Sequence, residues 1–424
     1  MIALLALTLT VSAATPVLTL DEALQAARRD NLDLKVARAR LEQSQLLTRR
    51  AWAGYLPTVA VSGGYTRNSE VSLPEGLPLP PGVNFTPPVN VFNAQAELRQ
   101  ALISPQLWPA IRSAGIAEDV AELNTENARR EILFAVAQSY FGAASLQEAI
   151  RATEFLLSVN KAREADTQKR FEAGTVTRVA LLRAQFDRAR AEQDLLRARN
   201  AFASSRLALA TLIQRDSDFT LELPPVPEVP PAEADLTEQA LQQRPDVRAA
   251  RRNLDLALSR RQGVWFSYAP SIGLTGVYRR SSAGNILMPG ESWAVTVGAQ
   301  WTLWDGGLRE INLREESARV AEASAQQKQS EARVTEEVAR ARLEFENARA
   351  NLAKAEEALS LARETQRLTE ISFKAGVATY LEVADANNAL TGAEVGAISE
   401  RLQTSMSALR LLRAAGLFMA EDSK

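Results

Sequence analysis

Two stretches of the chain decide its fold: RFEAGTVTRVALLRAQ at 170–185 and SFKAGVATYLEVADAN at 372–387. Each contains Phe-x-Ala-Gly followed by a Thr, and the two glycines, Gly174 and Gly376, are 202 positions apart. Gly suits the left-handed position that ends a helix, and a Thr shortly afterwards can cap the next helix. Each stretch therefore predicts a helical hairpin with a very tight turn.

The placement of proline predicts that the sequence around both turns is helical. No proline occurs from Ala110 to Leu223 or after Pro289, and proline costs about 3 kcal/mol inside a helix. Both tracts carry apolar residues every three or four positions on a charged background, which is typical of helices with one packed face. A helix from Pro105 to Ala173 would be on the order of 100 Å long. Ordinary globular domains do not contain such helices, so we expect a rod.

The chain is one unit of roughly 200 residues written twice. Besides the glycine turns, Tyr55-Leu56-Pro57 and Tyr268-Ala269-Pro270 correspond, at a separation of 213 positions. The expected segments are a first repeat at 15–223 with its turn at 173–177, a Pro-rich linker at 224–234, and a second repeat at 235–418 with its turn at 375–379.

The first 14 residues have the pattern of a secretory signal peptide. Ile2 to Val11 are apolar or Thr, and small residues follow as far as Ala14. A basic start is missing, and the alternative interpretation is a short buried helix. No later segment is apolar for about 18 residues, as a membrane-spanning helix requires.

Each repeat also contains a β-hairpin, expected at about 56–104 and about 269–304. In 293–303, Trp, Val, Ala and Leu alternate with small or polar residues, and the strands of the first hairpin alternate similarly. This pattern is typical of a transmembrane β-barrel, in which Glu97 and Arg99 would face the lumen. Four strands cannot close a barrel, so we expect two or three chains to share one. The alternative is a pair of amphipathic hairpins that cover a helical bundle.

The composition excludes much chemistry. Without a single His or Cys, the chain cannot form imidazole or thiolate metal sites or catalytic triads. A net charge of −2 gives no reason to expect nucleic acid as a partner. The paired carboxylates Glu336-Glu337 and Glu356-Glu357 diverge around a helix, and phosphate-binding glycine motifs are missing. We therefore predict no enzyme activity, no catalytic residue, no metal and no cofactor.

The order and duplication of these elements resemble the TolC family of outer-membrane efflux proteins. The resemblance runs from about Leu18 to Gly416 and is carried by the two glycine turns, Arg244-Pro245-Asp246 and WTLWDGGLRE at 301–310. It implies a mainly α fold with a small β part, in which long α-helical hairpins form a tunnel and four strands join a shared transmembrane β-barrel. It further implies a homotrimer in the outer membrane of a Gram-negative-type cell, surrounded by lipid. A periplasmic adaptor and an inner-membrane pump would be its partners.

The resemblance also implies roles for particular residues. Adaptors dock at the hairpin tips in the family, which correspond here to Ala173, Gly174, Thr175, Val176, Thr177, Ala375, Gly376, Val377, Ala378 and Thr379. Acidic side chains narrow the periplasmic entrance of the family's tunnel, which corresponds to Glu382 and Asp385, whereas the first repeat carries Arg178 and Arg183 in the equivalent stretch. The alternative is that the glycines only make turns and the carboxylates are only solvated.

Two functions follow from these expectations. The leading one is a passive exit duct of a tripartite efflux or type I secretion system, which conducts substrate from an inner-membrane pump through the periplasm and the outer membrane. The alternative is a periplasmic coiled-coil scaffold that does not insert into a membrane. That alternative leaves the lipid-like alternation of 293–303 unexplained.

Overall fold

The computed structural model describes residues 16–69, 88–231, 235–284 and 289–419. The expected signal peptide, most of the loop in the first β-hairpin and residues 232–234 of the linker lie outside the described residues. Along the chain the elements are β1 (Val17–Leu18), α1 (Leu20–Asp30), α2 (Leu32–Ser44), α3 (Leu46–Ala53), β2 (Thr58–Arg67), β3 (Asn90–Ile103), α4 (Leu107–Glu172), α5 (Arg178–Ile213), β4 (Thr220–Leu221), α6 (Leu236–Gln243), α7 (Pro245–Phe266), β5 (Ser271–Ser281), β6 (Glu291–Gln300), α8 (Leu308–Lys374) and α9 (Tyr380–Ala414).

The chain forms two compact units, and each takes segments from both repeats. Of the described residues, the helical unit comprises 16–39, 125–231, 235–247 and 330–419, and the sheet unit comprises 40–69, 88–124, 248–284 and 289–329. The fold class is as predicted, because α4 and α8 are helices of 66 and 67 residues and the main sheet has four strands within the described residues. None of the described helices has a stretch long and apolar enough to cross a membrane.

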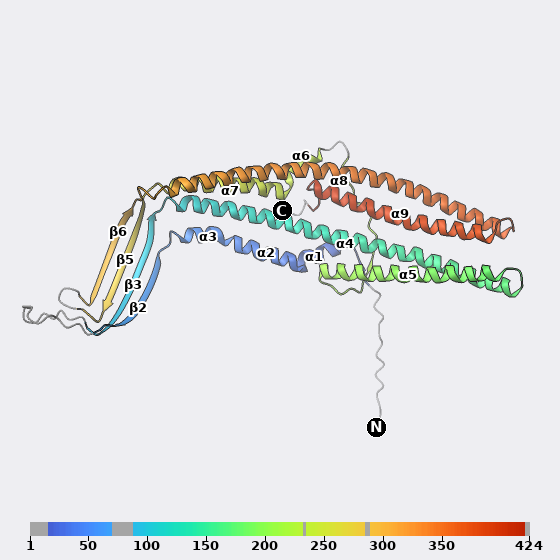
Figure 1. The fold of residues 1–424 in the computed structure, drawn as a ribbon, viewed down its shortest axis with the longest axis horizontal. Coiled ribbons are helices and arrows are strands. Elements are labelled where there is room, and N and C mark those ends of the chain that lie inside the picture. Colours follow the sequence, from blue (N-terminus) through green and yellow to red (C-terminus); the bar gives the residue numbers. More distant parts are fainter. Residues whose placement is uncertain (1–15, 70–87, 232–234, 285–288, 420–424) are drawn as a thin grey trace, which may run out of the picture. The chain divides into compact units, whose positions relative to one another are not determined.

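In the helical unit, α4 pairs with α5 and α8 pairs with α9 as two antiparallel hairpins (Figure 1). Leu157 of α4 packs against Ala191 and Leu195 of α5, and Arg188 of α5 pairs with Glu164 of α4 at 2.6 Å. In the second hairpin, the Thr404 hydroxyl donates to the Ala348 carbonyl at 3.1 Å. Lateral packing therefore stabilises helices that are too long to be stable alone.

A hydrophobic core joins α1, α4 and the C-terminal ends of α5 and α9. Tyr140 lies at its centre, and its hydroxyl is within 2.7 Å of the Leu18 carbonyl and 2.9 Å of the Glu222 carbonyl. Burial raises the pKa of Tyr140 to about 12, so the phenol stays protonated at neutral pH. Through Tyr140, α4 thus holds the parallel pair β1–β4 in place. This pair brings the start of the first repeat next to its end.

The sheet unit contains an antiparallel sheet with the order β2-β3-β5-β6 (Figure 1). The two hairpins are therefore neighbours through β3 and β5, and β2 and β6 are the edge strands of the described sheet. The register places the alternating apolar residues on one face, since Val61 is opposite Ala96, Ala96 is opposite Tyr278, and Tyr278 is opposite Trp293. The faces predicted from the alternation are confirmed for these strands.

Two details of the strands differ from the sequence prediction. Strict alternation along β3 would place Leu102 on the face of Leu98, but the β3–β5 register shifts between Ala101 and Ile103. A bulge inserts one residue and moves later side chains to the other face. The alternation also predicted a strand to Leu303, whereas β6 ends at Gln300. There the Trp301 indole donates to the Tyr268 carbonyl at 2.9 Å, outside the strand ladder.

At equivalent positions of the two repeats, different side chains donate hydrogen bonds to equivalent backbone carbonyls. Asn31 donates through its amide nitrogen to the Leu212 carbonyl at 2.8 Å. Arg244, 213 positions later, donates to the Ala414 carbonyl at 3.1 Å. Leu212 and Ala414 are 202 positions apart and end the returning helices α5 and α9. We call these two contacts the carbonyl latches.

Arg244 makes the stronger latch. Its guanidinium also binds Asp246 through two hydrogen bonds, of 3.0 and 2.7 Å, and Glu337 of α8 at 2.8 Å. Burial alone would lower the pKa of Arg244, but the hydrogen bonds and charges of both carboxylates outweigh burial and raise it. The Arg-Pro-Asp motif therefore fixes the start of α7 to α8 and α9, because Pro245 opens the helix while its neighbours bind each other.

We expect Arg244→Ala to loosen the second latch by about 2 kcal/mol, since charge-assisted hydrogen bonds to partly buried carboxylates are lost. Hydrogen–deuterium exchange should quicken at the start of α7 and the end of α9. Asn31→Ala should loosen the first latch by about 1 kcal/mol, because a neutral hydrogen bond is lost. Arg252→Ala, which removes only half-exposed ion pairs, is the control. Equal exchange in all three variants would contradict the latches.

Candidate docking tips and duct-lining residues

The first predicted tip, 173–177, is the turn between α4 and α5. Gly174 has φ +71°, its N–H donates to the Phe171 carbonyl at 2.9 Å, and the N–H of Thr175 donates to the Arg170 carbonyl at 2.8 Å. This pair of bonds is a Schellman motif, which needs a left-handed residue at its centre. Thr177 then caps α5, with its hydroxyl accepting from the Ala180 N–H at 3.3 Å.

The second tip, 375–379, repeats this geometry. Gly376 has φ +78° and donates to the Phe373 carbonyl at 3.0 Å, and Val377 donates to the Ser372 carbonyl at 2.9 Å. Val377 is the most exposed large hydrophobic residue of the described chain, at 82%. Ala173, Ala375 and Thr175 are also exposed, whereas Val176 and Ala378 are half-buried. Both tips therefore present backbone and small side chains to solvent.

The two tips differ in how the returning helix begins. Thr379 and Glu382 form a capping box, in which the carboxylate accepts from the Thr379 N–H at 2.6 Å and from its hydroxyl at 2.9 Å. These two bonds lower the pKa of Glu382. The equivalent position in the first repeat, 202 residues earlier, is Ala180, so only the Thr177 half of the box exists there.

The predicted entrance residues, Glu382 and Asp385, are exposed side chains of α9 one turn apart. Their equivalents 202 positions earlier are Ala180 and Arg183. Glu382 has a structural partner in Thr379, because its N–H donates to the Thr379 hydroxyl. The sequence analysis did not predict that Glu382 caps α9, although Thr-x-x-Glu is the known signature of a capping box. The tips thus share a backbone conformation, whereas the helices that follow them begin with opposite charges: Arg178 and Arg183 on α5, Glu382 and Asp385 on α9.

The predicted lumen residues lie on β3. Glu97 is opposite Ala60 and Val277, and Arg99 is opposite Thr58 and Thr275, so both lie on the polar face of the sheet. Their side chains form an ion pair with each other. On the same face, Arg279 donates to the Gln95 side chain at 3.1 Å. The structure therefore brings the two predicted residues together, within a short polar row.

Tryptophan gathers where the sheet meets the helices, a feature that the sequence predicted only for strand ends. Five of the six tryptophans lie outside the strands but within six residues of a strand end. Trp52 contacts Tyr55, Trp265 contacts Tyr268, and Trp108 contacts Phe266 with ring centroids 5.9 Å apart. Trp and Tyr favour the boundary between membrane and water. The short distance in sequence between these tryptophans and the strand ends was the signal that could have predicted their clustering.

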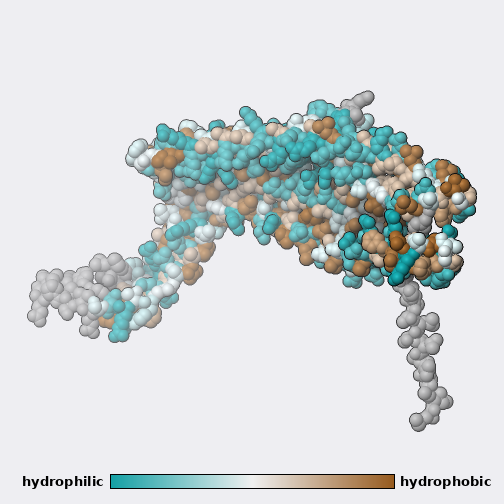
Figure 2. Space-filling model, turned by 45° about the vertical axis from the view of Figure 1, so that its right-hand side comes forward, coloured by the Kyte–Doolittle hydropathy of each residue, from teal (hydrophilic) through white to brown (hydrophobic). Residues whose placement is uncertain are grey.

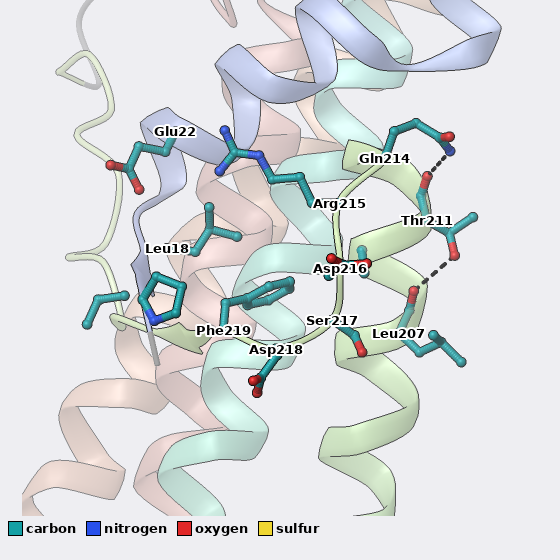
Figure 3. Close-up of a pocket in the computed structure, with 13 residues that line it drawn as sticks. Leu18, Glu22, Leu207, Thr211, Gln214, Arg215, Asp216, Ser217, Asp218 and Phe219 are labelled. Carbon is teal, nitrogen blue, oxygen red and sulfur yellow. Dashed lines mark hydrogen bonds between the residues drawn. The ribbon is translucent and has the colours of Figure 1, made fainter. Parts of the chain in front are cut away.

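An open pocket of about 1150 Å³ lies beside the end of α5 (Figure 3). Leu18 and Phe219 are buried residues of the helical core, while Glu22, Arg215, Asp216 and Asp218 contribute charges of both signs. Gln214 ends α5 with a left-handed φ of 52°, and its side chain donates to the Thr211 carbonyl at 2.7 Å. The lining of this pocket, like the rest of the chain, contains no His or Cys.

A metal site is not found in the described ranges either, where no group of three or more acidic residues could hold an ion. The geometry is that of two rod-like helical hairpins with capped tips and of a sheet with one apolar and one polar face. Such elements suit a protein that assembles and encloses a passage.

Comparison with known proteins assigns the chain to a family of membrane channels. The sequence profile described as "Outer membrane efflux protein" matches residues 23–214 and 236–417, one match for each repeat. The chain therefore belongs to the outer membrane efflux protein family, and the predicted TolC-type relationship is confirmed. Its members are channels of the outer membrane with a long periplasmic tunnel. This protein is therefore located in the outer membrane and extends into the periplasm.

Solved structures show the same fold at low identity. The outer membrane protein VceC from Vibrio cholerae is 20% identical with a TM-score of 0.75, and 94% of this chain covers 96% of that one. The CmeC channel from Campylobacter jejuni is 16% identical with a TM-score of 0.79, covering 95% and 87%. The MtrE channel from Neisseria gonorrhoeae, solved in an open state, is 21% identical with a TM-score of 0.74, covering 94% and 89%. No curated protein sequence matches the chain.

Thr379→Ala should weaken the start of α9 by about 1 kcal/mol, because the cap of a helix is removed. Amide exchange over 380–384 should quicken about fivefold, measured by mass spectrometry. Thr177→Ala is the matched change in the first tip and should act on 178–182 only. An effect of either variant on both tips would show that the tips do not open independently.

The lowered pKa of Glu382 makes the cap of α9 in the second tip dependent on pH. A carboxylate whose pKa is lower in the folded state stabilises that state above its ordinary pKa of about 4.3, and this stabilisation is lost as pH falls through the lower value. Protection of 380–384 should therefore decline below about pH 4, whereas 178–182, with Ala180 at the equivalent position, should not change.

Glu382→Gln is the control, because an amide cannot titrate, and it should flatten the profile of the second tip. A decline that persists in Glu382→Gln would assign the effect to another group.

Proposed function

We propose that the protein is the exit duct of a tripartite efflux or type I secretion system and that it conducts substrate passively. Three copies would share a barrel of twelve strands and a tunnel of twelve helices. Membership of the outer membrane efflux family supports this proposal. Substrate would enter between the helical tips and leave through the barrel, while a pump in the inner membrane supplies the energy.

The observation that carries the proposal is the described sheet, which has an apolar face and two edge strands, β2 and β6. Val59, Val61, Trp293, Val295 and Val297 on the apolar face are between 63% and 79% exposed. In lipid, an apolar face is stable but an unpaired strand edge costs several kcal/mol for each backbone group. Joining β6 to β2 of another copy removes both edges. Glu97 and Arg99 would then face the lumen.

The tips are the proposed docking surface for a periplasmic adaptor. Residues 173–177 and 375–379 expose backbone and small side chains, which let a partner approach closely. Val377 offers an apolar contact at the second tip. Adaptor binding would loosen the helices at the tips and widen the entrance, where three copies of Glu382 and Asp385 would form rings of negative charge that favour cations.

Cysteine labelling tests the topology, because the chain contains no cysteine. Ser69→Cys lies just beyond the far end of β2, and Val377→Cys lies at the second tip. In intact cells, a membrane-impermeant maleimide should label Ser69→Cys but label Val377→Cys only after the outer membrane is opened. Protection of both would contradict the barrel and support the periplasmic scaffold.

Conductance across planar bilayers tests the entrance. Glu382→Gln with Asp385→Asn should lower the preference for K⁺ over Cl⁻ severalfold, since the proposed rings lose their charge. Glu172→Gln, which removes an exposed carboxylate at the end of α4 beside the first tip, is the matched control and should leave selectivity unchanged. Unaltered selectivity in the double variant would place the narrowest charged point of the duct elsewhere.

A further inference from the structure

One face of the sheet has the same order of residues in both halves of the chain. Every second residue from Val59 to Arg67 on β2 reads Val-Val-Gly-Tyr-Arg, and every second residue from Ile272 to Arg280 on β5 reads Ile-Leu-Gly-Tyr-Arg. Each residue of the first row is 213 positions before its counterpart. Both rows lie on the apolar face, because side chains two apart in a strand share a face. An arginine therefore ends the apolar row in both repeats.

The register of the strands determines which residues lie beside each arginine. Arg67 is opposite Asn90 on β3, and Arg280 is opposite Ala94 on β3 and Glu291 on β6. Arg67 and Asn90 are exposed, and the Arg280 side chain is 71% exposed. Figure 2 shows hydrophilic side chains at this end of the sheet. The face therefore changes from apolar to charged at the level of the two arginines.

Aromatic rings lie one position before each arginine on this face. Tyr65 contacts Phe92 with ring centroids 4.9 Å apart, and Tyr278 is opposite Trp293, which is 77% exposed. Tyr and Trp favour the boundary between membrane and water, and a strand of about 9–11 residues spans a membrane. The strand β2 has 10 residues and ends at Arg67, on the side away from α3 (Figure 1). Arg67 would therefore lie at the level of the lipid headgroups, where an arginine costs little.

The two arginines differ in their partners. Arg280 pairs with Glu291 at 3.3 Å, whereas Arg67 has no ion pair with any residue that the structure describes. The Tyr65 hydroxyl donates to the side-chain oxygen of Asn90 at 2.8 Å. This bond leaves the amide nitrogen of Asn90 as the group that can donate to an anion. Arg67 and Asn90 thus offer donors and a positive charge, while Glu291 neutralises the charge of Arg280.

We propose that Arg67 and Asn90 bind the phosphate of a phosphorylated lipid in the outer leaflet of the outer membrane, while Tyr65 and Phe92 pack against the same lipid below its headgroup. We call these four residues the Arg67 site. A guanidinium matches phosphate in charge and in geometry, because its N–H groups form a planar fork. A soluble anion would use the donors alone, whereas a lipid also uses the exposed aromatic pair beside them. The inference rests on the proposed barrel and goes beyond it by naming the residues and the lipid chemistry.

Lipid binding to the purified full-length protein tests the Arg67 site. Native mass spectrometry from detergent counts the molecules of diphosphorylated lipid A bound to the parent and to each variant. Arg67→Gln should lower the apparent affinity about tenfold, because the charge-assisted bonds to phosphate are lost. Asn90→Asp can still accept from Tyr65 but places a negative charge beside the phosphate, so it should weaken binding similarly. Equal affinity in the parent and in both variants would overturn the site.

Two controls identify the chemistry of the ligand. Arg280→Gln is the matched variant in the second repeat and should change the affinity by less than about twofold, since Glu291 already holds that guanidinium. Lipid A without its phosphates should bind the parent as weakly as intact lipid A binds Arg67→Gln. If inorganic phosphate binds the parent as tightly as lipid A does, the site takes a soluble anion and the proposal is overturned.

Glu291→Gln tests the same chemistry by a gain of binding, which a misfolded variant would not produce. The change releases Arg280, so the second repeat then also has an arginine without a counter-charge beside exposed aromatic rings. A second molecule of lipid A should bind each chain, and adding Arg280→Gln should remove it. Absence of the second lipid would show that a free arginine on this face does not attract lipid phosphate, which contradicts the proposal.

Labelling of Ser69→Cys separates failure of this site from failure of the duct. If the maleimide labels Ser69→Cys in intact cells while Arg67→Gln binds lipid A as the parent does, the lipid site is wrong and the duct topology stands. If Ser69→Cys stays protected, Arg67 does not reach the outer leaflet, and both proposals fail whatever affinity is measured in detergent.

Discussion

Lateral packing of one helix against another is the interaction on which the whole structure depends. Helices of 66 and 67 residues have no globular domain around them, so every turn has to be held by a neighbour. Their sequences meet this requirement with small and apolar residues at heptad spacing, such as the buried Val334, Ala341 and Ala348 on α8. Charged side chains on the remaining faces keep the surface soluble and add ion pairs across each hairpin, such as Arg199 with Glu154.

Local sequence also determines where the helices begin and end. At both tips a left-handed glycine closes a Schellman motif and a Thr caps the returning helix. At the other end of each returning helix, a carbonyl latch ties the last turn to the start of a short helix. Between these fixed points the returning helices have 36 and 35 residues, so the two hairpins are nearly equal in length.

Duplication gave the two repeats one backbone, and their side chains have since diverged. The latch uses a neutral Asn31 in one repeat and an ion-paired Arg244 in the other. The second tip has Glu382 and Asp385 where the first has Ala180 and Arg183. The two repeats are therefore alike in backbone conformation and different in charge.

The sequence by itself determined the helices, the turns, the duplication and the faces of the strands. Prolines, glycines, caps and alternation act within a few residues, so their effect can be predicted without knowing the rest of the chain. Only the tertiary structure decided that β3 lies beside β5, that a bulge follows Ala101, that β6 stops at Gln300, and that Arg244 and Asn31 serve equivalent carbonyls. It also decided that Val179 of α5 and Leu343 of α8 are exposed, while Leu133 of α4 and Leu409 of α9 lie in one core. The reason is physical: these features depend on which distant segments meet, and one apolar stripe on a helix looks the same in sequence whether it faces its own chain or another.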